Sequence, residues 1–254
     1  MKIALNNIDY VIHAAALKQV DTAEYNPIEY IKTNIYGAQN LIEATIANDT
    51  KKIIALSTDK ACSPINLYGA TKLCSDKLFI AANNFIGEKK FSIVRYGNVE
   101  SSRGSVIPFF KEQKKNNLIT ITDNRMTRFN ISLNESVDLV LWALKNSIGG
   151  EIVIPKIKSY RIIDLANTIC PDCKYKIIGK RPGEKLHEEM ISAEDSSIKI
   201  DLGKVYILIS IGNEKNYSKL IKKFNGKILK SDFKYSSGEN ELLNKKELKK
   251  LVEI

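Results

Sequence analysis

Two groups of residues in this sequence could perform acid–base chemistry on a small substrate. Ser57, Thr58, Asp59 and Lys60 are consecutive and offer two hydroxyls, a carboxyl group and an amine. If Asp59 donates a proton and Lys60 accepts one, their protonation states oppose their ordinary pKa values of about 3.9 and 10.4. Such states need a partly desolvated, mutually coupled site. The alternative is an exposed Asp–Lys ion pair in a loop.

The second group is Tyr68 and Lys72, which are four residues apart and share one face if their segment is a helix. An ammonium group beside a tyrosine stabilises the phenolate, so we expect Lys72 to lower the pKa of Tyr68 and make it a usable base. The spacing alone carries no weight, because a lysine-rich chain with 11 tyrosines produces such a pair by chance. Its weight comes from position, since the pair opens a predicted helix soon after a predicted strand ends at Ser57 and Thr58.

Alternating strand and helix patterns surround both groups. Short apolar runs at residues 9–15, 52–57 and 91–96 predict buried strands, and helical spacing of apolar residues predicts helices over about 27–48 and 68–85. This order predicts a parallel sheet with right-handed crossovers, in which ligands bind at the carboxyl ends of the strands. His13, Ser57 and Gly97 fall at those ends, so the pattern predicts a site there.

Beyond residue 100 the pattern is less regular. Residues 103–108 and 125–129 indicate loops or short strands, residues 134–145 a helix, and residues 181–185 a turn that opens another helix. The sequence has no internal repeat and no low-complexity linker. We therefore expect a second lobe that interleaves with the first.

The charge and amino-acid composition limit the kinds of binding partner that we expect. The net charge of +10 is concentrated near the end of the chain, where residues 214–254 hold 11 lysines against six acidic residues. A nucleic-acid or membrane patch is one interpretation of this lysine-rich tail, but only six arginines are present, and a solvated surface is favoured. With no signal peptide and no apolar run long enough for a membrane span, we expect a cytoplasmic protein without nucleic-acid or membrane partners.

The four cysteines include Cys170 and Cys173 in a lone CxxC pattern. The second ligand pair of a zinc ribbon is missing, so we expect two reduced thiols in a loop and no metal site.

Residues 57–61 and 64–72 resemble the extended short-chain dehydrogenase/reductase family, and more narrowly the UDP-N-acetylglucosamine 4,6-dehydratases. The resemblance covers most of residues 9–190 and thins beyond about residue 195. Tyr68 and the residues after Lys72 are similar to the C5-inverting enzymes that begin pseudaminic acid synthesis for flagellin glycosylation. The matching segments besides 57–61 and 64–79 are residues 13–18, 24–27, 33–34, 95–99, 126–129 and 181–188.

The resemblance implies a role for each matching residue. Tyr68, assisted by Lys72 and Thr58, would take the C4 hydroxyl proton while a hydride passes to NADP (NAD is less expected). Lys60 would then remove the C5 proton, Asp59 would protonate the departing C6 hydroxyl, the hydride would return to C6, and C5 would be reprotonated from the opposite face. The residues implied to line the cofactor are Ala14, Leu56, Ser57, Tyr68, Lys72 and Val99.

The family also implies a UDP-N-acetylglucosamine site and a homo-oligomer. Three positions depart from the family pattern: Glu100 and Ser101 stand where the family has a small apolar residue and a glycine, and Asn130 replaces a common Trp. A carboxylate at Glu100 would repel the substrate diphosphate unless it points away. The residues implied to hold the UDP-sugar are Lys18, Asn98, Arg103, Gly104, Ser105, Val106, Ile107, Arg128 and Arg181.

The glycine-rich phosphate loop of the family is absent. None of the 13 glycines forms a Gly-x-x-Gly-x-x-Gly turn, and the residues before 9 lead directly into what resembles the fourth strand. We expect a Rossmann-like α/β fold without its first strands, divided into an NADP-binding portion at 1–99 and a mainly substrate-binding lobe at 100–254 that includes interleaved Rossmann elements and the lysine-rich tail.

Three functions follow from this reading. The first is an inverting UDP-N-acetylglucosamine 4,6-dehydratase, whose active-site half is present in this chain. The second is a retaining 4,6-dehydratase of polysaccharide biosynthesis. The third is a non-catalytic truncated remnant that still binds UDP-sugar.

Overall fold

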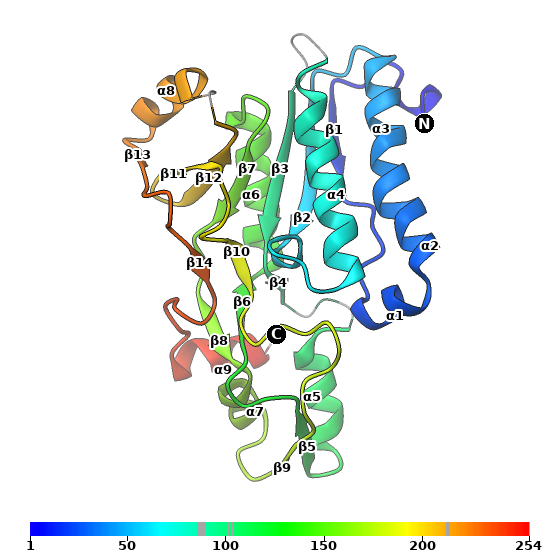
Figure 1. Cartoon of the computed structure of the whole chain (residues 1–254). Helices are drawn as coiled ribbons and strands as arrows, with labels where there is room; N and C mark the ends of the chain where they lie inside the picture. Colours follow the sequence, from blue (N-terminus) through cyan, green and yellow to red (C-terminus); the bar gives the residue numbers. More distant parts are fainter. Residues whose placement is uncertain (86–89, 101, 103, 212–213, 254) are drawn as a thin grey trace.

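The computed structural model describes residues 1–85, 90–100, 102, 104–211 and 214–253. Its centre is a seven-stranded sheet in the order β1-β2-β3-β7-β12-β11-β13 (Figure 1). Strands β1, β2, β3 and β7 run parallel, and β12, β11 and β13 are antiparallel to their neighbours. The predicted Rossmann-like α/β fold is confirmed. The strands are Tyr10–His13 (β1), Lys52–Thr58 (β2), Lys90–Tyr96 (β3), Ile152–Pro155 (β7), Ile198–Asp201 (β11), Val205–Ile209 (β12) and Lys227–Ile228 (β13).

Helices cover both faces of the sheet because β2 and β3 are apolar on both sides. Ile53 and Ala55 pack with α3 (Gly37–Ile46) and α4 (Leu67–Ala82). Ile54 points to the other face and packs with α6 (Leu133–Asn146) and α8 (Glu214–Lys223). Strands that are buried on both faces are typical of parallel sheets. Among the described residues β1 has only β2 beside it, and its Tyr10 and Ile12 remain exposed.

The predicted helix over 27–48 is confirmed, with an irregular centre. It consists of α2 (Pro27–Tyr30), a π-helical turn η2 (Ile31–Tyr36) and α3, and it follows the 3-10 turn η1 (Ile3–Leu5) and the short helix α1 (Val20–Tyr25). Asn34 lies in the π-helical turn and is buried. Its side chain bonds both backbone groups of Leu17 and the Thr71 hydroxyl on α4. This contact fixes the segment that follows β1 against the helix that carries Tyr68.

The second half of the chain contributes both to the main sheet and to a lower lobe (Figure 1). Three small sheets join β4 to β6 and β8, β5 to β9, and β10 to β14. The core of the lower lobe lies between α5, α7, α9 and the β5–β9 pair. The elements are Asn98–Val99 (β4), Val106–Lys114 (α5), Leu118–Ile121 (β5), Thr127–Ile131 (β6), Ser159–Arg161 (β8), Ile162–Ile169 (α7), Lys174–Ile177 (β9), Glu189–Ile191 (β10), Tyr235–Ser236 (β14) and Lys245–Glu253 (α9).

Two local predictions are wrong. Residues 106–108 were expected in a loop or short strand but open α5, where Pro108 is tolerated in the first helical turn and Ile107 is buried in the lower core. The turn at 181–185 leads into β10 and not into a helix. The reason is a partner distant in sequence, because β10 pairs with β14.

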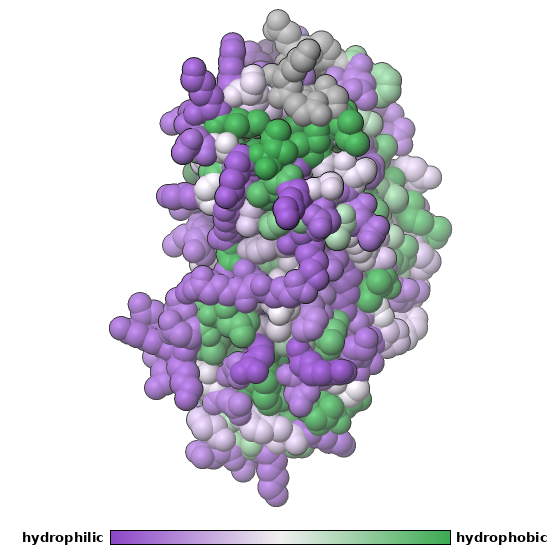
Figure 2. All heavy atoms as spheres, turned by 60° about the vertical axis from the view of Figure 1, so that its left-hand side comes forward, coloured by the Kyte–Doolittle hydropathy of each residue, from purple (hydrophilic) through white to green (hydrophobic). Residues whose placement is uncertain are grey.

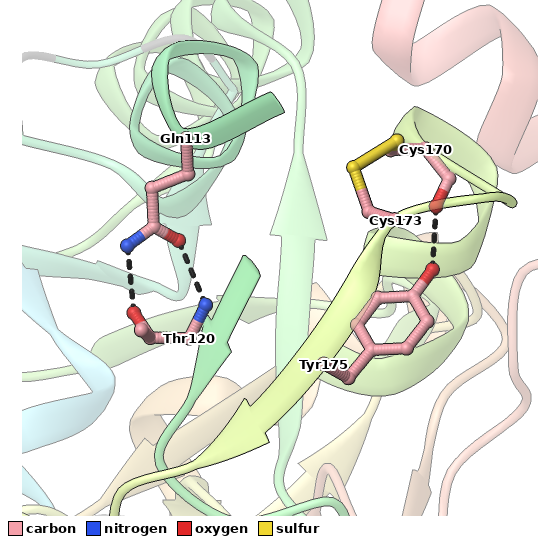
Figure 3. Close-up of a disulfide and its surroundings, with 5 residues drawn as sticks. All are labelled: Gln113, Thr120, Cys170, Cys173 and Tyr175. Carbon is pink, nitrogen blue, oxygen red and sulfur yellow. Dashed lines mark hydrogen bonds between the residues drawn. A yellow bond between two sulfur atoms is a disulfide. The ribbon is translucent and has the colours of Figure 1, made fainter. Parts of the chain in front are cut away.

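The expectation of two reduced thiols is also wrong, because Cys170 and Cys173 form a disulfide at the end of α7 (Figure 3). Both cysteines are buried in the lower core. The Tyr175 hydroxyl donates to the carbonyl of Cys170 at 2.6 Å. Nearby, the Gln113 side chain on α5 bonds the backbone N–H and the hydroxyl of Thr120 on β5. These contacts tie the two strands and two helices of the lower lobe together.

Figure 2 shows the face that carries α8 and β13, and hydrophilic side chains predominate there, with separate hydrophobic patches between them. In the described part of the chain, no helix is both long enough and apolar enough to cross a membrane.

Candidate active site

A cavity of about 630 Å³ opens at the carboxyl ends of β1, β2 and β3 and continues to the lower lobe. The residues expected to line the cofactor, namely Ala14, Leu56, Ser57, Tyr68, Lys72 and Val99, all line this one cavity. A hollow of similar size, about 670 Å³, lies near the opposite ends of the strands, but none of the predicted site residues lines it. The carboxyl-end cavity is therefore the candidate active site.

Asp59 and Lys60 form a buried pair at the end of β2, so the alternative of an exposed ion pair is wrong. They lie in the 3-10 turn η3 (Asp59–Ala61), where the Thr58 hydroxyl accepts a hydrogen bond from the backbone N–H of Lys60. Asp59 is fully buried, and its Oδ1 lies 3.0 Å from Lys60 Nζ and accepts a hydrogen bond from Thr58 at the same distance. Lys60 Nζ also lies 3.4 Å from Asn98 Oδ1. Lys60 lines the cavity, whereas Asp59 lies behind it.

The environment of this pair favours a proton on each group. Burial, together with the negative charge of Glu188, raises the pKa of Asp59 above its usual range, although Lys60 and Thr58 act in the opposite direction. Burial works to lower the pKa of Lys60, but the carboxylates of Asp59 and Glu188 outweigh it and raise that pKa. A protonated Asp59 is able to act as an acid. Lys60 has to lose its proton before it can act as a base.

Tyr68 and Lys72 lie on α4 and are both buried, but they do not act on each other as expected. Lys72 Nζ donates to the carbonyl of Leu56 at 2.7 Å, and burial lowers its pKa. Burial raises the pKa of Tyr68 to about 12, against the opposing effects of Lys60 and a hydrogen bond with Thr58. The predicted lowering of the Tyr68 pKa by Lys72 is therefore wrong here, because desolvation of the phenolate is the larger effect.

A buried network supports the end of β2 from behind. Ser57 donates its hydroxyl to Asp76 Oδ2 at 2.7 Å, and Arg95 Nη2 lies 3.2 Å from the same oxygen. Arg95 Nη1 also donates to the carbonyl of Met190 at 3.1 Å. Asp76 and Arg95 each keep only 3% of their side chain exposed. The sequence analysis missed this pair, because a contact between a helix and a strand leaves no spacing signal.

Only some of the residues expected to hold the sugar nucleotide line the cavity. Arg103 lies outside the described residues, and Ile107 is buried in the lower core and does not line the cavity. Arg128 is fixed by hydrogen bonds from Nη1 to the carbonyls of Thr127 and Leu186. Arg181 is 47% exposed and lies 3.6 Å from Asp21. Those that line the cavity are Lys18, Asn98, Gly104, Ser105, Val106, Arg128 and Arg181.

Two of the three departures from the family pattern, Glu100 and Asn130, contact each other, and the third, Ser101, lies outside the described residues. Asn130 Nδ2 donates to Glu100 Oε1 at 2.6 Å, and Glu100 does not line the cavity. The Glu100 carboxylate therefore points away from the region expected for the diphosphate, and the smaller Asn130 side chain provides its partner.

Glu188 is a buried, charged cavity residue that received no role from the sequence. Its Oε1 lies 3.5 Å from Lys60 Nζ and 3.8 Å from Arg128 Nε. It immediately precedes β10 and approaches Lys60 from the second half of the chain. The only signal for it was its place at the end of the matching 181–188 segment.

The cavity residues fit the nicotinamide end of a dinucleotide, since the buried Tyr68 and Lys72 line a space that Ala14 and Val99 also line. Among the described residues no glycine-rich turn joins a strand to a helix as a pyrophosphate cradle. The chain therefore supplies residues for one end of the cofactor.

Comparisons with known proteins agree with this geometry. A family model described as polysaccharide biosynthesis protein matches residues 1–210. The UDP-N-acetylglucosamine 4,6-dehydratase (inverting) of Campylobacter jejuni strain 81-176 is 50% identical over 99% of this chain and 78% of its own length. The UDP-glucose 4-epimerase of Rickettsia akari is 43% identical over 98% of this chain and 75% of its own length. The X-ray structure of Pen from Bacillus thuringiensis superposes with a TM-score of 0.88 at 40% identity, over 99% of this chain and 77% of that one.

Proposed function

This chain belongs to the polysaccharide biosynthesis protein family, and we propose that within it the protein is an inverting UDP-N-acetylglucosamine 4,6-dehydratase that serves pseudaminic acid synthesis. The observation that carries the proposal is the buried Asp59–Lys60 pair, in which Lys60 lines the same cavity as Tyr68 and Asp59 lies behind it. Elimination of water across C5 and C6 needs both an acid and a base in addition to the group that acts at C4. This pair supplies them.

The same observation separates the dehydratase from a 4-epimerase, the function printed for the Rickettsia relatives. Epimerisation at C4 removes and returns hydrogen at a single carbon and needs one proton-transfer group there, which Tyr68 could supply. It gives no use for a second acid–base pair. The burial of Asp59 and its bond to Lys60 therefore favour dehydration.

Substrate binding is proposed for the side of the cavity that faces the lower lobe. Arg128, Arg181 and Lys18 line it and would balance the two charges of a diphosphate. Arg128 is already oriented by two backbone carbonyls, so less side-chain freedom is lost on binding.

The residues then divide the proton transfers. When bound, NADP (or NAD) would supply the hydride acceptor and donor that the reaction needs at C4 and C6. Tyr68 takes the proton of the C4 hydroxyl, with Thr58 as its hydrogen-bond partner. Neutral Lys60 takes the C5 proton, and Asp59 gives its proton to the C6 hydroxyl oxygen as the C–O bond breaks and water leaves. Return of a proton to the opposite face of C5 inverts that carbon.

The remaining assignments extend this proposal. Residues 1–99 would form the cofactor-binding portion and residues 100–254 the mainly substrate-binding lobe of a cytoplasmic homo-oligomer.

To test this, the protein is incubated with UDP-N-acetylglucosamine and NADP, and the product is identified by mass spectrometry and NMR. We expect a product that has lost one water and has an inverted C5. Asp59→Asn and Lys60→Met should each abolish product, whereas Glu100→Gln, a charge removed outside the cavity, should not. A product with unchanged C5 would identify a retaining dehydratase, and UDP-N-acetylgalactosamine would identify an epimerase. Tight UDP-sugar binding without any product would indicate a binding protein.

A further inference from the structure

Glu188 is held so that its side chain must enter the active site. Ser237, which is fully buried, donates its backbone N–H to the Glu188 carbonyl at 2.8 Å, and its hydroxyl accepts from the Glu188 N–H at 2.9 Å. Both backbone groups of Glu188 are thus fixed by one residue of the C-terminal segment. The Glu188 side chain keeps only 4% of its surface exposed and lines the cavity.

The carboxylate completes the surroundings of the Lys60 ammonium. An ammonium has three N–H donors, and Lys60 Nζ has three acceptors within reach. These are Asp59 Oδ1 at 3.0 Å, Asn98 Oδ1 at 3.4 Å and Glu188 Oε1 at 3.5 Å. They come from η3, β4 and the residue before β10, so removal of Glu188 releases one of three constraints on the direction of Lys60.

Two buried oxygens in this cluster have no hydrogen-bond partner among the described residues: Asp59 Oδ2 and Glu188 Oε2. Both carboxylates lie within 3.5 Å of the same nitrogen, so their bonded oxygens are at most about 7 Å apart. Two buried carboxylates at this separation resist being charged together, and the proton is then retained on one of them. Gly97 lines the cavity next to this oxygen, and Phe129 leaves no room for a larger residue there, since a Cβ at Gly97 would lie 2.5 Å from Phe129 Cβ and 3.4 Å from Asp59 Oδ2.

The other charged groups decide which carboxylate holds the proton. Three cations face Glu188: Lys60 on η3, Arg128 on β6 and Lys185 in the loop before Glu188. Burial works to raise the pKa of Glu188, but these three cations outweigh it and lower that pKa. Asp59 faces Lys60 and Glu188 but is more deeply buried, and its pKa is raised. The phenol of Tyr160 on β8 completes the ring of titratable groups, and burial raises its pKa as well.

We propose that Glu188 is a positioning residue that holds the Lys60 side chain toward the cavity and sets the pH range in which Asp59 is protonated and Lys60 is neutral, as the reaction needs. The proposal rests on the proposed dehydratase function. In this arrangement Glu188 stays charged, Asp59 keeps the proton that it gives to the C6 hydroxyl, and Glu188 itself exchanges no proton with the substrate.

The sign of the effect follows from the charge. The Glu188 carboxylate raises the pKa of both Asp59 and Lys60. The reaction needs Asp59 protonated and Lys60 neutral, so Asp59 sets the loss of activity at one end of the pH profile and Lys60 at the other. Glu188→Gln should therefore move the whole pH profile of kcat to lower pH, by about one unit or more for two charges this close. Glu188→Asp keeps the charge and should leave the profile in place.

The experiment compares wild type with Glu188→Gln, Glu188→Asp and the control Glu189→Gln, which makes the same chemical change one residue further along and does not line the cavity. The pH profiles of kcat are measured together with a second readout that needs no turnover. In protein labelled with ¹³C at the aspartate carboxyl carbons, the Asp59 signal is identified by its loss in Asp59→Asn and is titrated by NMR.

The expected result is a lower Asp59 titration midpoint and a displaced pH profile in Glu188→Gln only. A kcat that falls by the same factor at every pH, with an unmoved Asp59 midpoint, would show a merely structural role and overturn the inference. If the Asp59 midpoint moves but wild type makes no dehydrated product, the inference about proton placement stands and the proposed function fails. If wild type makes the dehydrated product but the Asp59 midpoint does not move in Glu188→Gln, the proposed function stands and the inference about proton placement fails.

Discussion

Removal of the Arg95 side chain should destabilise the protein strongly, because it leaves Asp76 charged and buried. Arg95→Met keeps an apolar chain of similar length but loses the 3.2 Å contact with Asp76 and the bond to the Met190 carbonyl. Both side chains of the pair are 3% exposed, so solvent cannot replace the lost partner. Breaking a buried ion pair on one side costs about 3–5 kcal/mol.

The assay is urea unfolding followed by circular dichroism, with thermal melting as a second measure. For a chain of this size the loss corresponds to a melting temperature lower by roughly 6–20 °C. Arg161→Met is the matched control, since its ion pair with Asp164 lies at the surface and its removal should change the free energy of unfolding by no more than about 0.5 kcal/mol.

A double variant distinguishes the cause. If the uncompensated charge is responsible, adding Asp76→Asn to Arg95→Met should recover about 1 kcal/mol or more. A loss below about 1 kcal/mol in Arg95→Met, or strictly additive losses in the double variant, would refute the reasoning that this pair is coupled and inaccessible to solvent.

Three further predictions concern single sites. Tyr68→Phe should lower kcat by about 10²-fold or more with little change in KM, since it removes only the proton acceptor at C4, and steady-state kinetics would contradict this if KM alone changed. Burial and the nearby Lys72 lower the pKa of His13 to about 4, so its contribution to stability is present above about pH 6.5 and is lost as the pH falls toward 4. Wild type should therefore lose about 2 kcal/mol more than His13→Gln between pH 7 and pH 4, a value reduced for partial exposure of the ring, and equal losses in urea unfolding would contradict it. Replacement of Cys170 and Cys173 by serine should lower the free energy of unfolding by about 1–2 kcal/mol. It should leave kcat unchanged, because the disulfide lies in the lower lobe, and a loss of activity in a variant that is still fully folded would contradict this.

The sequence was sufficient to predict the fold wherever a local pattern of apolar residues determines a strand or a helix. β1, β2 and β3 are short apolar runs, of which β2 and β3 are buried on both faces, and α4 follows its apolar spacing. Asp59 and Tyr68 could therefore be placed at one edge of the sheet before any contact was known. The irregular second half was not predictable in this way, because β10 depends on β14, a partner distant in the chain.

The protonation of the site could not be predicted from residue types. The expected effect of Lys72 on Tyr68 ignored burial, which dominates the Tyr68 pKa. Glu188 approaches Lys60 from a segment distant in sequence, just before β10, and carries no spacing signal, although its charge raises the pKa of both Asp59 and Lys60. The disulfide was missed because a lone CxxC pattern does not distinguish reduced from bonded thiols.

We propose that Asp59, Lys60 and Tyr68 together dehydrate a UDP-sugar, and proton NMR of UDP-N-acetylglucosamine incubated with the protein and NADP in D₂O tests this directly. The expected product has a C6 methyl group, a C4 carbonyl and deuterium at an inverted C5, because Lys60 removes that proton and solvent-derived deuterium returns. A product that keeps its C6 hydroxyl and its C5 proton, with only C4 changed, would show that these residues do not perform the dehydration.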